Sequence, residues 1–138
     1  MLHPFDFYTE PGDVIAITGP SGEGKTTLLR LLLGLVEPKS GKAWLSGGKA
    51  YPIGAGTRRA FSYVPQGNSI FAGTVAQNLR LFCPEATDEE LCRALDAACA
   101  LEFVEQLPGK LEHLLGAGGR GLSEGQAQRL AIARALLR

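Results

Sequence analysis

The residues best suited to chemistry in this sequence form a glycine-rich run that ends in a lysine and a threonine. The run fits the spacing G-x-x-x-x-G-K-[ST]. Its members are Gly19, Pro20, Ser21, Gly22, Glu23, Gly24, Lys25 and Thr26. An apolar, β-branched run (residues 14–18) precedes it, and a stretch rich in helix-forming residues (residues 25–33) follows it. A strand, a glycine loop and a helix in this order are typical of a phosphate-binding loop.

Each part of this loop has a role that follows from its chemistry. Glycines let successive backbone N–H groups curve around an anion, and the following helix adds free N–H groups and the positive end of its dipole. We expect Lys25 to reach the β- and γ-phosphates and the Thr26 hydroxyl to bind Mg²⁺. Thr27 could contact the α-phosphate. The loop therefore predicts a nucleoside triphosphate, but kinases, GTPases, helicases and transport ATPases share it.

A second group that could bind an anion lies at the start of the last helix expected from the sequence. Its members are Leu122, Ser123, Glu124, Gly125 and Gln126. Gly125 costs about 1 kcal/mol of helix propensity relative to alanine, yet its bare backbone suits the close approach of a ligand. From these residues alone, an ordinary capped helix and an anion site both stay open.

The order of the motifs resembles the ATP-binding domain of ABC transporters over nearly the whole chain. After the phosphate loop come Tyr-Val-Pro-Gln at residues 63–66 and Leu-Ser-Glu-Gly-Gln at residues 122–126. The latter run is similar to that family's signature sequence, usually LSGGQ, and Gln66 falls at the place of its Q-loop glutamine. Residues 70–79 are similar to exporter-type members, although Ala117 stands where those members usually carry a glutamate.

This resemblance implies a mechanism in which two such domains pair head to tail. ATP lies between the phosphate loop of one copy and the signature residues of the other, so that Ser123 and Gly125 contact the γ-phosphate bound by the second copy. Gln66 contacts Mg²⁺ or the attacking water, whereas Glu23 and Glu124 are expected to be solvated loop charges. The implied cofactors are ATP and Mg²⁺. The implied partners are a second ATP-binding domain and transmembrane domains, at the cytoplasmic face of the cell membrane.

The resemblance also implies ATP hydrolysis that drives substrate export across a membrane. In the family, a strand ending in aspartate, a catalytic glutamate and a switch histidine follow the signature helix, and none of them stands in these 138 residues. We therefore expect an incomplete domain that binds nucleotide weakly without turnover, within an intact protein that is a transport ATPase. The alternatives are a binding module without turnover and an ABC ATPase outside transport.

The motifs need an α/β fold of the P-loop NTPase type to position them. We expect a parallel sheet core that contains strands at residues 14–18 and 60–64. A small antiparallel subdomain with a turn at Gly47-Gly48 is expected near residues 40–60. The expected division is a phosphate-loop core with this subdomain, about residues 1–71, and a helical subdomain, about residues 72–138.

Capping boxes, in which a hydroxyl and a carboxyl or amide satisfy free N–H groups reciprocally, predict three helix starts. The pairs are Thr74 with Gln77, Thr87 with Glu90, and Ser123 with Gln126. The helix after Thr87 is expected to bury Leu91, Leu95 and Ala98 on one face.

Composition excludes some classes of function. The 14 Lys and Arg residues balance 14 Asp and Glu residues, which argues against a nucleic-acid binder held by phosphate contacts. No apolar run reaches the ~18 residues of a membrane span. The odd number of cysteines indicates reduced thiols, and we expect Cys92, Cys99 and Trp44 to serve packing.

Overall fold

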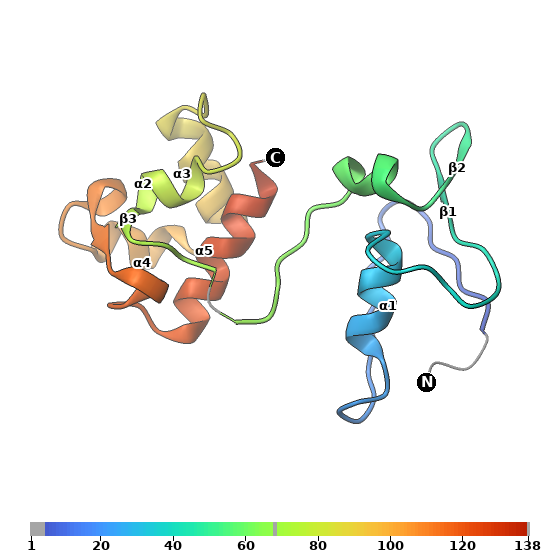
Figure 1. The fold of residues 1–138 in the computed structure, drawn as a ribbon. Coiled ribbons are helices and arrows are strands. Elements are labelled where there is room, and N and C mark those ends of the chain that lie inside the picture. The colour runs from blue at the N-terminus through green and yellow to red at the C-terminus, as the bar shows by residue number, and fades with distance from the viewer. Residues whose placement is uncertain (1–4, 68, 138) are drawn as a thin grey trace. The chain divides into compact units, whose positions relative to one another are not determined.

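The computed structural model describes residues 5–67 and 69–137. It divides the chain into two compact units, Met1–Phe61 and Ser62–Arg138. Figure 1 shows the first unit in blue to green and the second in green to red. Each unit is described by itself.

The first unit contains the helix after the glycine loop and a short hairpin. Helix α1 (Lys25–Leu32) begins at the end of the loop, as predicted. Strands β1 (Trp44–Ser46) and β2 (Ala50–Pro52) pair antiparallel, which confirms the predicted hairpin around the two glycines. A 3₁₀ helix (Ala55–Ala60) follows, and the Arg58 guanidinium donates to the carbonyls of Leu33 and Gly34 just beyond the end of α1.

The parallel sheet expected around residues 14–18 is not formed within the described residues. Both sheets of residues 5–67 and 69–137 have two strands and are antiparallel, and neither contains residues 14–18 or 61–64. Val14 is 98% exposed. A strand satisfies its backbone N–H and C=O groups only through a neighbouring strand. An apolar, β-branched run without such a neighbour therefore stays irregular, and the prediction of these two strands is wrong for this structure.

The second unit contains most of the helices of the described residues. Its helices are α2 (Val75–Leu79), α3 (Asp88–Ala97), α4 (Leu101–Gln106) and α5 (Glu124–Leu136). Strands β3 (Gly73–Thr74) and β4 (Leu114–Leu115) form a short antiparallel pair, and 3₁₀ turns occupy Lys110–Glu112 and Ala117–Gly119. All three predicted capping boxes are confirmed. In the described part of the chain, no helix combines the length and apolar character that a membrane crossing requires.

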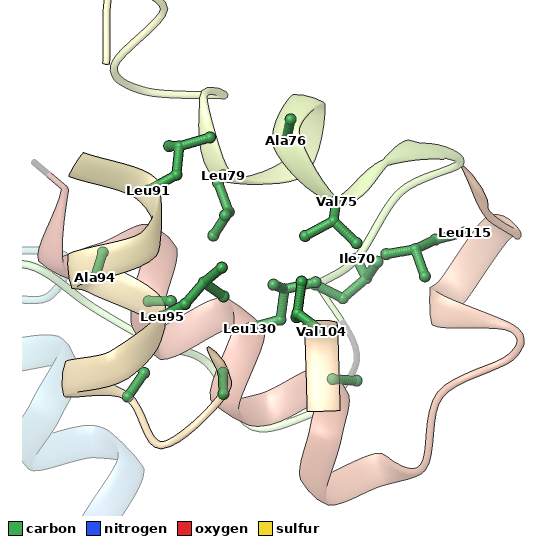
Figure 2. Packing of buried hydrophobic residues seen from close by; sticks show 14 of the residues in the cluster. Ile70, Val75, Ala76, Leu79, Leu91, Ala94, Leu95, Val104, Leu115 and Leu130 are labelled. Carbon is green, nitrogen blue, oxygen red and sulfur yellow. The ribbon is translucent and has the colours of Figure 1, made fainter. Parts of the chain in front are cut away.

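The hydrophobic core of the second unit lies among these helices. Leu79, Leu91, Leu95 and Leu130 are almost completely buried, and Figure 2 shows them together. Ala98 is also buried, so the predicted apolar face of α3 is confirmed.

Two predictions about packing are wrong. Trp44 is 53% exposed, because the sheet that carries it has only two strands among the described residues and buries little of either face. Cys99 is exposed and Cys92 only partly buried. Cys99 lies just beyond the end of α3 at a φ of 53°, where the backbone leaves the helix and its apolar face.

Replacing Leu95 by alanine should lower the free energy of unfolding of the helical unit by about 2–5 kcal/mol, because a fully buried side chain leaves a cavity. The matched control is Leu81→Ala. Leu81 is 46% exposed, so the loss should stay within about 0.5 kcal/mol. Urea unfolding followed by circular dichroism measures both. Equal losses in the two variants would contradict the assignment of this core.

Candidate nucleotide-binding site

The glycine loop leaves the first turn of α1 accessible to an anion. Gly22 and Gly24 have φ values of 90° and 97°, a left-handed conformation that side chains other than glycine rarely adopt. Gly24 is the N-cap of α1, and no side chain caps this helix. The first N–H groups of a helix have no partner within it. The sequence therefore builds a loop and a helix start whose donors can face a phosphate.

Lys25 lies across this loop. Its Nζ donates to the carbonyl oxygens of Gly19 at 2.7 Å and Pro20 at 2.6 Å. An ammonium has three donors, so one donor is left for an anion while the other two fix the side chain. The arrangement holds a positive charge at the mouth of the loop.

The other members of the loop surround this charge. Ser21, Glu23, Thr26 and Thr27 are exposed. A Cβ atom built on Gly19 would lie 2.9 Å from Oε2 of Glu23, so the flexible end of this side chain would have to shift, and the φ of 147° at Gly19 is one that favours glycine. The spare donor of Lys25 and the uncapped helix start fit phosphate groups, and the exposed Thr26 hydroxyl is an oxygen ligand of the kind that Mg²⁺ accepts.

The start of α5 differs from that of α1 because side chains cap it. The Gln126 N–H donates to Ser123 Oγ at 3.2 Å, and the Ser123 N–H donates to Gln126 Oε1 at 2.9 Å. Glu124 and Gly125 are exposed, and Leu122 packs against the core. A Cβ atom added to Gly125 would meet nothing within 4 Å. The fold of this unit therefore does not need glycine at this position.

Gln66 is exposed in the second unit, three residues before a firmly held segment. Arg134 of α5 donates from Nη1 to the Ser69 carbonyl at 3.0 Å and from Nη2 to Ser69 Oγ at 2.7 Å. Arg134 is only 7% exposed, and burial lowers the pKa of its guanidinium. The guanidinium also lies 5.8 Å from the centre of the Phe82 ring, within the range of a cation–π contact.

Asn78 of α2 holds the next part of this segment. The Phe71 N–H donates to Asn78 Oδ1 at 3.1 Å, and Asn78 Nδ2 donates to the carbonyls of Phe71 and Thr74, both at 3.0 Å. Neither Asn78 nor Arg134 was predicted to contact this segment. The available signal was a polar residue inside an apolar stretch, Asn78 in α2 and Arg134 among the alanines of α5.

The predicted site residues fall into two groups. The phosphate loop belongs to the first unit, and Gln66 and the signature residues belong to the second. Within the second unit, α5 carries the signature residues at its start and Arg134 near its end. These two places are about 15 Å apart along the helix axis, at 1.5 Å per residue.

P-loop nucleotide-binding proteins are defined by a glycine loop that leads into a helix, with the first N–H groups of the helix left uncapped and a lysine beside them. The sequence pattern of the family described as "ABC transporter" matches residues 2–138, and the chain belongs to this family. The fold is therefore that of a P-loop NTPase, and membership of the family implies nucleotide binding.

The chain is similar to parts of much longer transport proteins. It is 42% identical over 138 residues to an ATP-dependent lipid A-core flippase of Chromobacterium violaceum. The aligned region covers 99% of the chain and 24% of that protein. It is 40% identical over 139 residues to a mycobactin import ATP-binding/permease protein of Mycolicibacterium thermoresistibile. The aligned region covers 100% of the chain and 24% of that protein. The chain thus spans about a quarter of the length of these curated relatives.

A solved structure shares the fold. The structure of a bacterial Atm1-family ABC exporter with ATP bound matches with a TM-score of 0.70 and 30% sequence identity. The match covers 86% of this chain and 21% of that exporter chain.

Replacing Ser123 by alanine should lower the free energy of unfolding by about 1 kcal/mol, because the Gln126 N–H loses its acceptor. The control Ser123→Asp keeps an acceptor at the N-cap and should stay within about 0.5 kcal/mol of the parent chain. Urea unfolding measures both variants. If alanine proved as stable as serine, the capping role of Ser123 would be wrong.

Proposed function

We propose that this chain is part of the nucleotide-binding domain of an ABC transporter and that it binds ATP with Mg²⁺ at the phosphate loop. The observation that carries the proposal is the Lys25 ammonium, which the Gly19 and Pro20 carbonyls hold at the start of the uncapped helix α1. The match to an exporter whose structure has ATP bound supports the same ligand.

In this proposal the loop binds the phosphates through charge and backbone donors together. Lys25 binds the β- and γ-phosphates, Thr26 supplies a hydroxyl to Mg²⁺, and Thr27 contacts the α-phosphate. The remaining contacts come from the backbone of the loop at Gly19, Pro20, Ser21, Gly22, Glu23 and Gly24. Mg²⁺ supplies neutralisation of phosphate charge when bound.

The signature residues would act on ATP bound to a second copy of the domain, paired head to tail. Ser123 Oγ accepts a hydrogen bond from Gln126, which leaves the Ser123 O–H free to donate to a γ-phosphate. The open space above Gly125 lets such a phosphate approach the backbone. Leu122, Glu124 and Gln126 complete this face, and Gln66 contacts Mg²⁺ or orients the attacking water.

The proposed biological role is ATP hydrolysis that drives export across a membrane. The partners would be a second ATP-binding domain and transmembrane domains, with this domain at the cytoplasmic face. The relatives include a flippase and a protein named for import, so we assign the choice of direction to the transmembrane part.

We also propose a functional division of the chain into a phosphate-loop part, about residues 1–71, and a helical part, about residues 72–138.

Replacing Lys25 by alanine should weaken ATP binding about 10- to 100-fold, because a charge-assisted contact worth about 1.5–3 kcal/mol is lost. Titration of the 138-residue chain with a fluorescent ATP analogue measures the affinity. The matched control is Lys49→Ala, which removes an exposed lysine from the hairpin of the same unit and should change affinity less than twofold. Equal affinity for the parent chain and the Lys25 variant would remove the basis of the proposal.

Replacing Gly125 by aspartate should stop hydrolysis in an assembled transporter while ATP still binds each single loop. The added carboxylate would face a γ-phosphate, and a like-charge contact of this kind costs about 3 kcal/mol or more, which lowers the rate at least about 100-fold. The control Gly125→Ala meets nothing within 4 Å and should preserve the fold. If the aspartate variant lost nucleotide binding to the isolated chain, the assignment of Gly125 to the second copy's ATP would be wrong.

A further inference from the structure

The segment that follows Gln66 is fixed at three consecutive residues. Ser69 is bound through both its carbonyl and its hydroxyl by Arg134. Ile70 is 4% exposed in the core, and Phe71 is bound through both its N–H and its carbonyl by Asn78. Two polar side chains from two helices, α5 and α2, thus hold an irregular segment by its backbone.

The bond between Arg134 and Ser69 spans 65 residues of sequence. Its donor sits on α5, the same helix that carries Ser123 and Gly125 at its start. A buried guanidinium is costly unless its donors are paired. Burial lowers the pKa of Arg134, and its two bonds to Ser69 and the face of Phe82 offset this cost. Leucine or methionine would fill the same space without the cost of burying a charge. We therefore infer that the guanidinium of Arg134 is needed for its hydrogen bonds.

We propose that Arg134 is a positioning residue that ties the segment carrying Gln66 to the signature helix α5. Gln66 lies only three residues before Ser69, so the reach of its side chain depends on where Ser69 is held. Helix α5 then connects the signature residues at its start with the segment that follows Gln66, which Arg134 holds near its end. This inference rests on the proposed function for Gln66 and the signature residues, whereas the anchoring itself can be tested without nucleotide.

The geometry requires arginine at this position. The two bonds come from two nitrogens of one planar guanidinium, and they reach a carbonyl and a hydroxyl of the same residue. Lysine keeps the charge but carries a single nitrogen, so it cannot reproduce this fork. Arg134→Lys is therefore the informative substitution. Arg129→Lys is the matched control, because Arg129 lies on the same helix and contacts an aromatic ring, Phe103, at 5.6 Å.

Amide hydrogen exchange of the 138-residue chain tests the anchoring. In Arg134→Lys, the amides of residues 69–71 should exchange about tenfold faster or more, while those of α3 stay within about twofold of the parent chain. Arg129→Lys should leave residues 69–71 unchanged. Acceleration of equal size throughout α2 to α5 would show that Arg134 only stabilises the unit, and unchanged exchange at residues 69–71 would show that it anchors nothing; either result overturns the proposal.

The rate of ATP hydrolysis in a transporter assembled on this domain tests the link to Gln66. Arg134→Lys should lower kcat about tenfold and leave KM for ATP within about twofold. In a Gln66→Ala background, followed by single-turnover hydrolysis so that slow rates are measured, the same change should have no further effect. A further tenfold loss in that background would show that Arg134 does not act through Gln66.

The failure of this inference and the failure of the proposed function give different results. If Lys25→Ala leaves ATP affinity unchanged, the proposed function fails, whatever happens at residues 69–71. If Lys25 binds ATP as proposed but Arg134→Lys changes neither local exchange nor kcat, only the role of Arg134 is wrong.

Discussion

The need of every backbone N–H and C=O group for a partner governs both units of this protein. A helix meets this need from within its own segment, whereas a strand depends on a neighbour. The second unit therefore folds around α2 to α5 and buries Leu79, Leu91 and Leu95. In the first unit, residues 14–18 have the composition of a buried strand but join no sheet of the described residues. The same rule leaves donors open at the start of α1, where phosphate binding is proposed.

The two helix starts that are proposed to contact nucleotide, one in each unit, use these open donors in opposite ways. At α1, glycine in a left-handed conformation replaces a capping side chain, so the donors stay available beside the Lys25 ammonium. At α5, Ser123 and Gln126 satisfy each other's backbone N–H groups, which leaves the hydroxyl hydrogen of Ser123 and the N–H groups of Glu124 and Gly125 to donate outward. The first arrangement suits tight binding of phosphate. The second suits a contact that forms when a ligand is presented by another molecule.

Helix α5 joins features that are distant in sequence. It begins at the signature residues, packs Ala127 and Leu130 into the core, and ends near the guanidinium that holds Ser69. Because a helix is stiff along its axis, a displacement at either end moves the other. In the proposed role of Arg134, its contacts with Ser69 and those of Asn78 with Phe71 act together with the buried Ile70 to hold the segment that follows Gln66.

The sequence by itself determined the phosphate loop, the hairpin, the three capping boxes and the apolar face of α3. Each of these depends on residues close together in the chain, so spacing alone reveals it. The tertiary structure decided what depends on residues far apart. Residues 14–18 can form a strand only if another strand pairs with their backbone N–H and C=O groups. Whether Trp44 and Cys99 are buried rests on what covers them. The hold of Arg134 on Ser69 joins groups 65 residues apart, and only folding brings such groups within hydrogen-bond distance.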